Sequence, residues 1–171
     1  MQAGVGKSGP NYAGLMPYLD PKNLAVAGTP LIEQVGKVAK TYEQELQAWL
    51  KGRYTDYAGN DAAAALAYFS GLKPEQQSIF LRTVYFAELK AGGREYNDPD
   101  SSRYGSYLRG RYAIEALFPE KDQDGKPITY AGDITMFGGS GVRTLFGGDI
   151  EMLTPGGQQV IGVEGQVPPA S

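Results

Sequence analysis

The middle of the chain carries apolar residues at steps of three and four, which is the spacing of amphipathic helices. This spacing predicts four helices, at about 30–51, 62–69, 74–91 and 101–118. The first has the clearest apolar stripe, made of Leu31, Val35, Val38, Tyr42, Leu46 and Trp49. The third carries apolar residues on two sides, so we expect it to lie between the others.

Capping residues and helix breakers set the expected ends of these helices. Thr29 and Pro30 suit the N-cap and first position of the first helix, and Asp61 suits the N-cap of the second. Gly92 and Gly93 are expected to end the third. Glycine and proline interrupt the first 28 residues, which predicts an irregular arm. The arm can pack onto the body through Tyr12, Leu15, Met16, Tyr18 and Leu19.

The pattern changes after Pro119. Residues 120–127 have the composition of a turn. Alternating residues then predict short strands at 128–130, 133–137, 142–146, 149–154 and 158–163. Two of these strands open with Gly-Asp, at Asp133 and Asp149. A repeated turn and strand is typical of stacked β-coils, in which such aspartates fix corners rather than catalyse.

These patterns together predict an α+β chain. A bundle-like module of about four helices would be followed by short strands at the edge of a β-helix or solenoid. The expected zones are an arm at 1–28, a helical module at 29–119, a turn or linker at 120–127 and a β-segment at 128–171. Glycine and proline concentrate at both ends, which supports this division into zones. The tail from Val167 to Ser171 has no terminal cap, so we expect the chain to be a piece of a longer protein.

Composition excludes several kinds of chemistry. The chain has no cysteine and no histidine, which excludes disulfides, thiolate or imidazole metal sites and histidine-based catalysis. A net charge of −3 and a pI near 5.0 argue against nucleic acid as a partner. No apolar run reaches the roughly 20 residues that span a bilayer. We therefore expect no metal, no cofactor, no nucleic acid and no membrane span.

The stretch from Glu88 to Arg111 concentrates charged residues and tyrosines. An ion-paired network that docks the helices is the first interpretation, since structural charge networks are common. Arginine and tyrosine together can also bind a sugar or an anion. The candidate binding residues are Arg94, Tyr96, Asp98, Arg103, Tyr104, Arg109 and Arg111.

Carboxylates in the same stretch leave a catalytic alternative open. Two carboxylates can cleave a glycosidic bond when they face each other across a cleft, and residues 88–115 supply several. The sequence does not show which of them face each other. A glycan-acting enzyme, or a glycan-binding module that uses residues 88–115, is therefore the alternative to a non-catalytic role. No residue is assigned as catalytic.

Three stretches of the chain carry a family resemblance. They run from Phe80 to Asp98, from Tyr130 to Thr144 and from Leu153 to Gly165. They resemble the C-terminal region of filamentous haemagglutinin-family exoproteins, and the likeness extends from about Asn11 to the end. The resemblance implies a large protein of Gram-negative bacteria that is secreted or held at the cell surface and folds as a right-handed parallel β-helix.

The resemblance also implies a function. Such a chain would be a non-catalytic structural and adhesive module that serves adhesion, aggregation or biofilm formation. Its partners would be the rest of the parent β-helical exoprotein, an outer-membrane secretion partner, and a glycan or protein of a host surface or matrix. A purely architectural role, in which the helices brace an exposed strand edge, is a further possibility.

Overall fold

The computed structural model describes residues 9–122, 124–130, 134–136 and 159–161, together with residues 132, 152 and 156. The chain divides into two compact units. The larger unit is Asn11–Pro119, and the smaller one combines residues 1–10 with 120–171.

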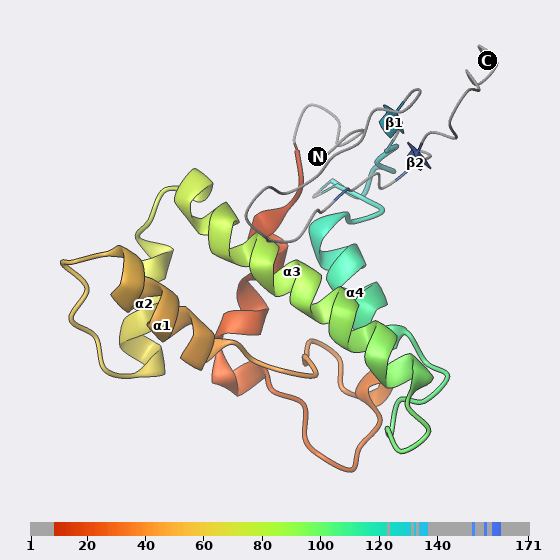
Figure 1. Ribbon diagram of the computed structural model, residues 1–171, viewed down its shortest axis with the longest axis horizontal. Helices are drawn as coiled ribbons and strands as arrows, with labels where there is room; N and C mark the ends of the chain where they lie inside the picture. The colour runs from red at the N-terminus through yellow and green to blue at the C-terminus, as the bar shows by residue number, and fades with distance from the viewer. Residues whose placement is uncertain are drawn as a thin grey trace. The chain divides into compact units, whose positions relative to one another are not determined.

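The larger unit is helical (Figure 1). Its α-helices are α1 (Glu43–Arg53), α2 (Ala62–Ser70), α3 (Pro74–Asn97) and α4 (Leu108–Leu117). Three 3-10 helices precede them: η1 (Tyr12–Leu19), η2 (Pro21–Asn23) and η3 (Leu31–Glu33). The long helix α3 packs against both α4 and η1, while α1 packs against α2. The most deeply buried apolar side chains are Leu15, Leu19, Leu46, Leu50, Phe69, Leu81, Val84, Tyr85 and Leu117.

Local capping places the starts of α2 and α3 where the sequence predicts them. Asp61 Oδ1 accepts a hydrogen bond of 2.7 Å from the backbone N–H of Ala64. Pro74 occupies the first turn of α3, where its missing N–H costs nothing. The side chain of Gln76 accepts a bond of 3.1 Å from the N–H of Lys73, which closes the helix start.

The first predicted helix is much shorter than expected, because α1 begins at Glu43 rather than near Pro30. Residues 24–38 form a loop instead, which includes the short η3 and is closed by a parallel bridge between Leu24 and Val38. Gly36 has a φ of +75°, a left-handed conformation that interrupts a right-handed helix. Val35, which the stripe places inside, is 95% exposed.

The third helix is longer than expected, and the fourth is shorter. α3 continues past Gly92 and Gly93 to Asn97. Residues 98–107 form a loop that turns at Gly105 with a φ of +70°, although residues 101–107 are expected to open the fourth helix. Tyr104 in this loop is consequently 60% exposed, whereas Leu117 and Phe118 at the end of α4 lie in the core.

The arm contributes to the core of the larger unit. Leu15, Tyr18 and Leu19 of η1 are buried against α3 and α4. The N–H of Asn11 donates a bond of 2.8 Å to the carbonyl of Leu117. The beginning and the end of this unit are therefore held together by the backbone.

The smaller unit contains a turn and one pair of very short strands within its described residues. Asp122 Oδ1 accepts bonds from the N–H groups of Asp124 (3.0 Å) and Lys126 (2.8 Å). The strands β1 (Ile134–Met136) and β2 (Gln159–Ile161) pair in parallel, with Ile134 opposite Gln159.

The predicted α+β fold class is wrong. The part of the chain that the structure describes is a helical module, and two strands of three residues do not form the edge of a β-helix or solenoid. Residues 128–130, expected as a strand, have no strand structure. Asp133, Asp149 and the expected strand at 142–146 lie outside the described residues. Gly-Asp repeats of this kind also occur in turns of many folds, so the repeat does not by itself specify stacked coils.

Candidate functional site

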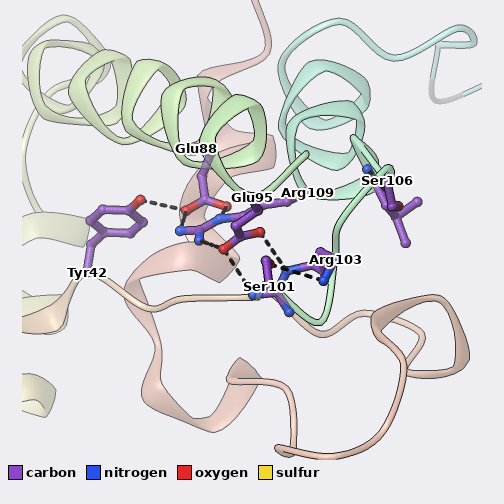
Figure 2. A network of polar contacts seen from close by, with 8 residues as sticks. Tyr42, Glu88, Glu95, Ser101, Arg103, Ser106 and Arg109 are labelled. Atoms are coloured by element: carbon purple, nitrogen blue, oxygen red, sulfur yellow. Dashed lines mark hydrogen bonds and ion pairs between the residues drawn. The ribbon is translucent and has the colours of Figure 1, made fainter. Parts of the chain in front are cut away.

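Five side chains converge between α3, α4 and the chain before α1 (Figure 2). They form a charge cluster composed of Tyr42, Glu88, Glu95, Arg103 and Arg109. Glu88 and Glu95 project from α3, Arg109 from the first turn of α4, and Arg103 from the loop between these helices. Tyr42 directly precedes α1. The charge cluster therefore ties together segments that are far apart in sequence.

Glu88 and Arg109 are the buried centre of the cluster. The Glu88 side chain is 0% exposed and that of Arg109 is 9% exposed. Arg109 Nε donates to Glu88 Oε2 at 2.8 Å, and Arg109 Nη2 donates to Glu88 Oε1 at 2.6 Å. This two-pronged geometry fits a planar guanidinium against a carboxylate, which makes strong charge-assisted bonds. The Tyr42 hydroxyl donates a third bond to Glu88 Oε1, of 2.5 Å.

Glu95 links this centre to the loop before α4. It accepts a bond of 2.6 Å from Arg109 Nη1 and bonds of 2.6 and 3.2 Å from Arg103 Nε and Nη2. Partial burial acts to raise the pKa of the Glu95 carboxyl, but the hydrogen bonds and positive charges of Arg103 and Arg109 outweigh it and lower that pKa. Glu95 is therefore held as the carboxylate anion.

Burial and pairing also fix the protonation of the groups around Glu88. Burial works to lower the pKa of Arg109, but the hydrogen bonds and charges of Glu88 and Glu95 raise it overall. Burial, followed by the hydrogen bond to Glu88, raises the pKa of Tyr42. Two carboxylates and two guanidiniums leave the charge cluster neutral, which a buried site requires.

The face of α3 that carries the cluster continues the core stripe. Leu81, Tyr85, Glu88, Gly92 and Glu95 follow one another at helical spacing along one side. A Cβ atom built on Gly92 would lie 2.9 Å from the backbone nitrogen of Gly110 in α4. Only glycine therefore lets the two helix backbones approach this closely, and the approach brings Arg109 within reach of both carboxylates.

The structure brings together two of the seven candidate binding residues. Arg103 and Arg109 both bind Glu95. Arg94 is exposed on α3, and Arg111 is exposed on α4. Tyr96 is 47% exposed and Tyr104 is 60% exposed. Asp98 accepts a bond of 3.0 Å from the N–H of Asp100. The candidates outside the cluster therefore lie around the 98–107 loop as separate surface groups.

Three members of the cluster are not among the seven candidate binding residues. Glu88 and Glu95 belong to the charged stretch, and Tyr42 belongs to the apolar stripe of the first predicted helix. One signal in the sequence could have found Glu88, because it occupies an inward position between Tyr85 and Gly92. A carboxylate at such a position needs a buried partner.

The cleft beside the cluster does not set two carboxylates against each other. It has a volume of about 430 Å³, and Phe80, Val84, Ala87 and Ala91 line it together with Tyr42 and Arg109. Its carboxylate lining comes from Glu45, which forms an ion pair with Lys40. Within the described residues, no three metal-ligating side chains gather into a group.

Comparison with known proteins found no match for this chain among family models, curated proteins or solved structures. The described residues also include no helix that is both long and apolar enough to cross a membrane.

Proposed function

We propose that this chain is a non-catalytic structural and adhesive module of a large secreted or surface-exposed bacterial exoprotein. The observation that carries the proposal is that arginines bind both carboxylates of the charge cluster. Glu88 and Glu95, two carboxylates of the charged stretch, are both bound by arginines. Such groups hold a scaffold rigid rather than exchange protons with a substrate.

The state of Glu95 supports this assignment against glycosidic chemistry. A retaining or inverting glycosidase needs one carboxyl group with a raised pKa that can donate a proton to the leaving group. Arg103 and Arg109 lower the pKa of Glu95. Glu88 is fully buried and bonded by Arg109 and Tyr42, so a glycan has no access to it.

The proposed setting follows from the family resemblance. An exoprotein of this kind would reach the cell surface through an outer-membrane secretion partner, and the remainder of the exoprotein would be the permanent neighbour of this module. Adhesion, aggregation or biofilm formation would place its exposed helical surface against a glycan or protein of a host, a matrix or a sister cell.

A coated-surface assay tests this function. The intact chain is adsorbed to a surface, and the bacteria or epithelial cells that resist washing are counted against surfaces coated with serum albumin or with the heat-denatured chain. We expect retention several-fold above both controls. The same preparation is incubated with soluble polysaccharides. New reducing ends that disappear in a Glu95→Gln variant would show an enzyme instead, and absence of retention would refute the adhesive role.

A further inference from the structure

A group of aromatic side chains comes from the end of α1 and from α2. These two helices pack together (Figure 1). Trp49 and Tyr54 meet edge to face with ring centroids 5.6 Å apart, and so do Tyr54 and Tyr68, also at 5.6 Å. All three side chains are half-buried. The buried rings of Phe69 and Phe80 pack against Trp49 and support it from below the surface. We name Trp49, Tyr54 and Tyr68 the aromatic platform.

Polar groups border the aromatic platform on two sides. The guanidinium of Arg53 lies over the Trp49 ring, 5.6 Å from its centroid, in a cation–π arrangement. Asp56 Oδ1 accepts a bond of 2.8 Å from the Tyr68 hydroxyl. The side chains of Arg53 and Asp56 are exposed, so both retain capacity for further hydrogen bonds to a ligand.

From this arrangement we infer that the aromatic platform binds a neutral saccharide. A pyranose ring has an apolar C–H face that packs on an aromatic ring, while its hydroxyls both donate and accept hydrogen bonds. Rings with a few convergent polar groups at their edge are the usual composition of a small-ligand site. Arg53 supplies donors and Asp56 supplies an acceptor at that edge, which matches a ligand carrying hydroxyl groups.

Local charge favours a neutral ligand over a charged one. Arg53 over Trp49 and Asp56 bonded to Tyr68 contribute one charge of each sign, so these bordering groups leave no excess of either sign. Single-stranded nucleic acid also stacks on aromatic rings, but its binding depends on a positively charged groove. A neutral glycan needs no such field.

The loop between α1 and α2 adds one unsatisfied group. The Tyr57 hydroxyl is buried and has no hydrogen-bond partner among the described residues, and the Tyr57 ring contacts that of Tyr68 at 5.1 Å. Gly59 lies directly against this hydroxyl. A buried polar group without a partner is unfavourable, so a shift of this loop that offers Tyr57 a sugar hydroxyl would favour binding.

Trp49 is the only tryptophan in the chain, so its fluorescence reports on the platform directly. The intact protein is titrated with cellohexaose, chitohexaose and laminarihexaose. We expect a saturable change in Trp49 emission with at least one of them. Tyr54→Ala should weaken this binding about tenfold, which corresponds to the loss of one stacking contact. No saturable change with any of the three would overturn the inference.

A matched variant tests whether the effect is specific to the platform. Tyr12 is a half-buried tyrosine of η1, like Tyr54 in its exposure, and Tyr12→Ala should leave hexaose binding unchanged. Equal binding by Tyr54→Ala and the unaltered protein, or a loss in Tyr12→Ala, would overturn the inference. If circular dichroism shows that Tyr54→Ala is unfolded, Asp56→Ala serves instead, because it removes the acceptor at the edge of the site and should weaken binding several-fold.

The inference rests on the proposed adhesive function, but the two can fail separately. A chain that retains cells and binds no hexaose refutes the saccharide platform only. A chain that binds a hexaose and cleaves it refutes the non-catalytic assignment. A chain that binds a hexaose through Tyr54 yet retains no cells leaves the platform in place and removes the adhesive role.

Discussion

The residues that matter most in this module are charged and buried. Glu88 and Arg109 are placed in the core, where each alone would carry a large desolvation penalty. Together with Glu95, Arg103 and Tyr42 they satisfy one another through short hydrogen bonds. A network of this kind stabilises one arrangement of helices over others, because a shifted arrangement would leave a buried charge unpaired.

Residue chemistry predicts how acid affects stability. The folded state lowers the pKa of Glu95 below its ordinary value of 4.5. Its contribution to folding is therefore complete above the unfolded pKa and is lost as the pH falls through the folded pKa. Glu95→Gln should lower the free energy of unfolding by about 2 kcal/mol at pH 7.

Urea unfolding of the unaltered chain and Glu95→Gln, followed from pH 7 to pH 3, measures this effect. The difference between the two proteins should shrink as the pH falls through the ordinary pKa of 4.5 toward the lower pKa of the folded state. A difference that is constant over the whole range would contradict the assigned role of the carboxylate.

The sequence predicts part of this residue-scale picture. Arg103 and Arg109 are recognisable as candidates, because charge and tyrosine concentrate around them. Tyr42, which donates to Glu88 from 46 residues away along the chain, is not recognisable as a member of the cluster from the sequence. Burial decides the partnership, and burial is a property of the folded module.

At the scale of elements, local signals succeed where nothing distant competes with them. The caps at Asp61 and Pro74 depend on neighbouring residues only, and both helices begin as predicted. The stretch from Pro30 to Tyr42 has a helical spacing but folds as a loop. There Val38 exchanges backbone hydrogen bonds with Asn23 and Ala25, which a single-sequence pattern does not reveal.

The glycine pair in α3 shows the same influence of distant contacts. The sequence predicts that the helix ends at Gly92 and Gly93, yet α3 continues for one more turn. Contact with α4 at Gly110 compensates the poor helix propensity of glycine there. Tertiary packing therefore explains the first glycine of the pair, whereas a Cβ on the second would contact nothing within 4 Å.

This difference gives a prediction with its own control. Gly92→Ala should destabilise the chain by about 1–3 kcal/mol, because the new methyl group meets the backbone of α4. Gly93→Ala adds the same methyl group where there is open space and should stabilise α3 by up to about 1 kcal/mol. Thermal unfolding of both variants measures the shifts. Equal midpoints for the two would disprove the close approach of α3 and α4.

At the scale of the whole molecule, the helical unit Asn11–Pro119 has its own core, and its two ends are joined to each other. Its first and last segments meet through the bond from Asn11 to Leu117. The expectation of a β-solenoid came from repeated Gly-Asp phrases and from a family resemblance, and the described residues do not contain that fold. Short glycine-rich phrases specify turns well, but they do not specify how turns stack.

The helical unit should fold without the rest of the chain. A fragment of residues 11–119 keeps the charge cluster, the buried apolar residues of η1 and all four named α-helices. We expect it to show strong helical circular dichroism and to unfold in one cooperative thermal transition. The midpoint temperature of that transition should lie within a few degrees of the midpoint at which the intact chain loses its helical signal. A gradual, non-cooperative loss of signal would mean that the larger unit depends on residues outside it.

The central claim is that the charge cluster stabilises the module rather than serving catalysis. Denaturant unfolding of Glu88→Gln, compared with Glu115→Gln, tests it most directly. Glu115 is an exposed carboxylate on α4, and its loss should change the free energy of unfolding by less than about 0.5 kcal/mol. Loss of the Glu88 charge leaves Arg109 poorly compensated, and we predict a decrease of about 3 kcal/mol. Equal stability of the two variants would contradict the account.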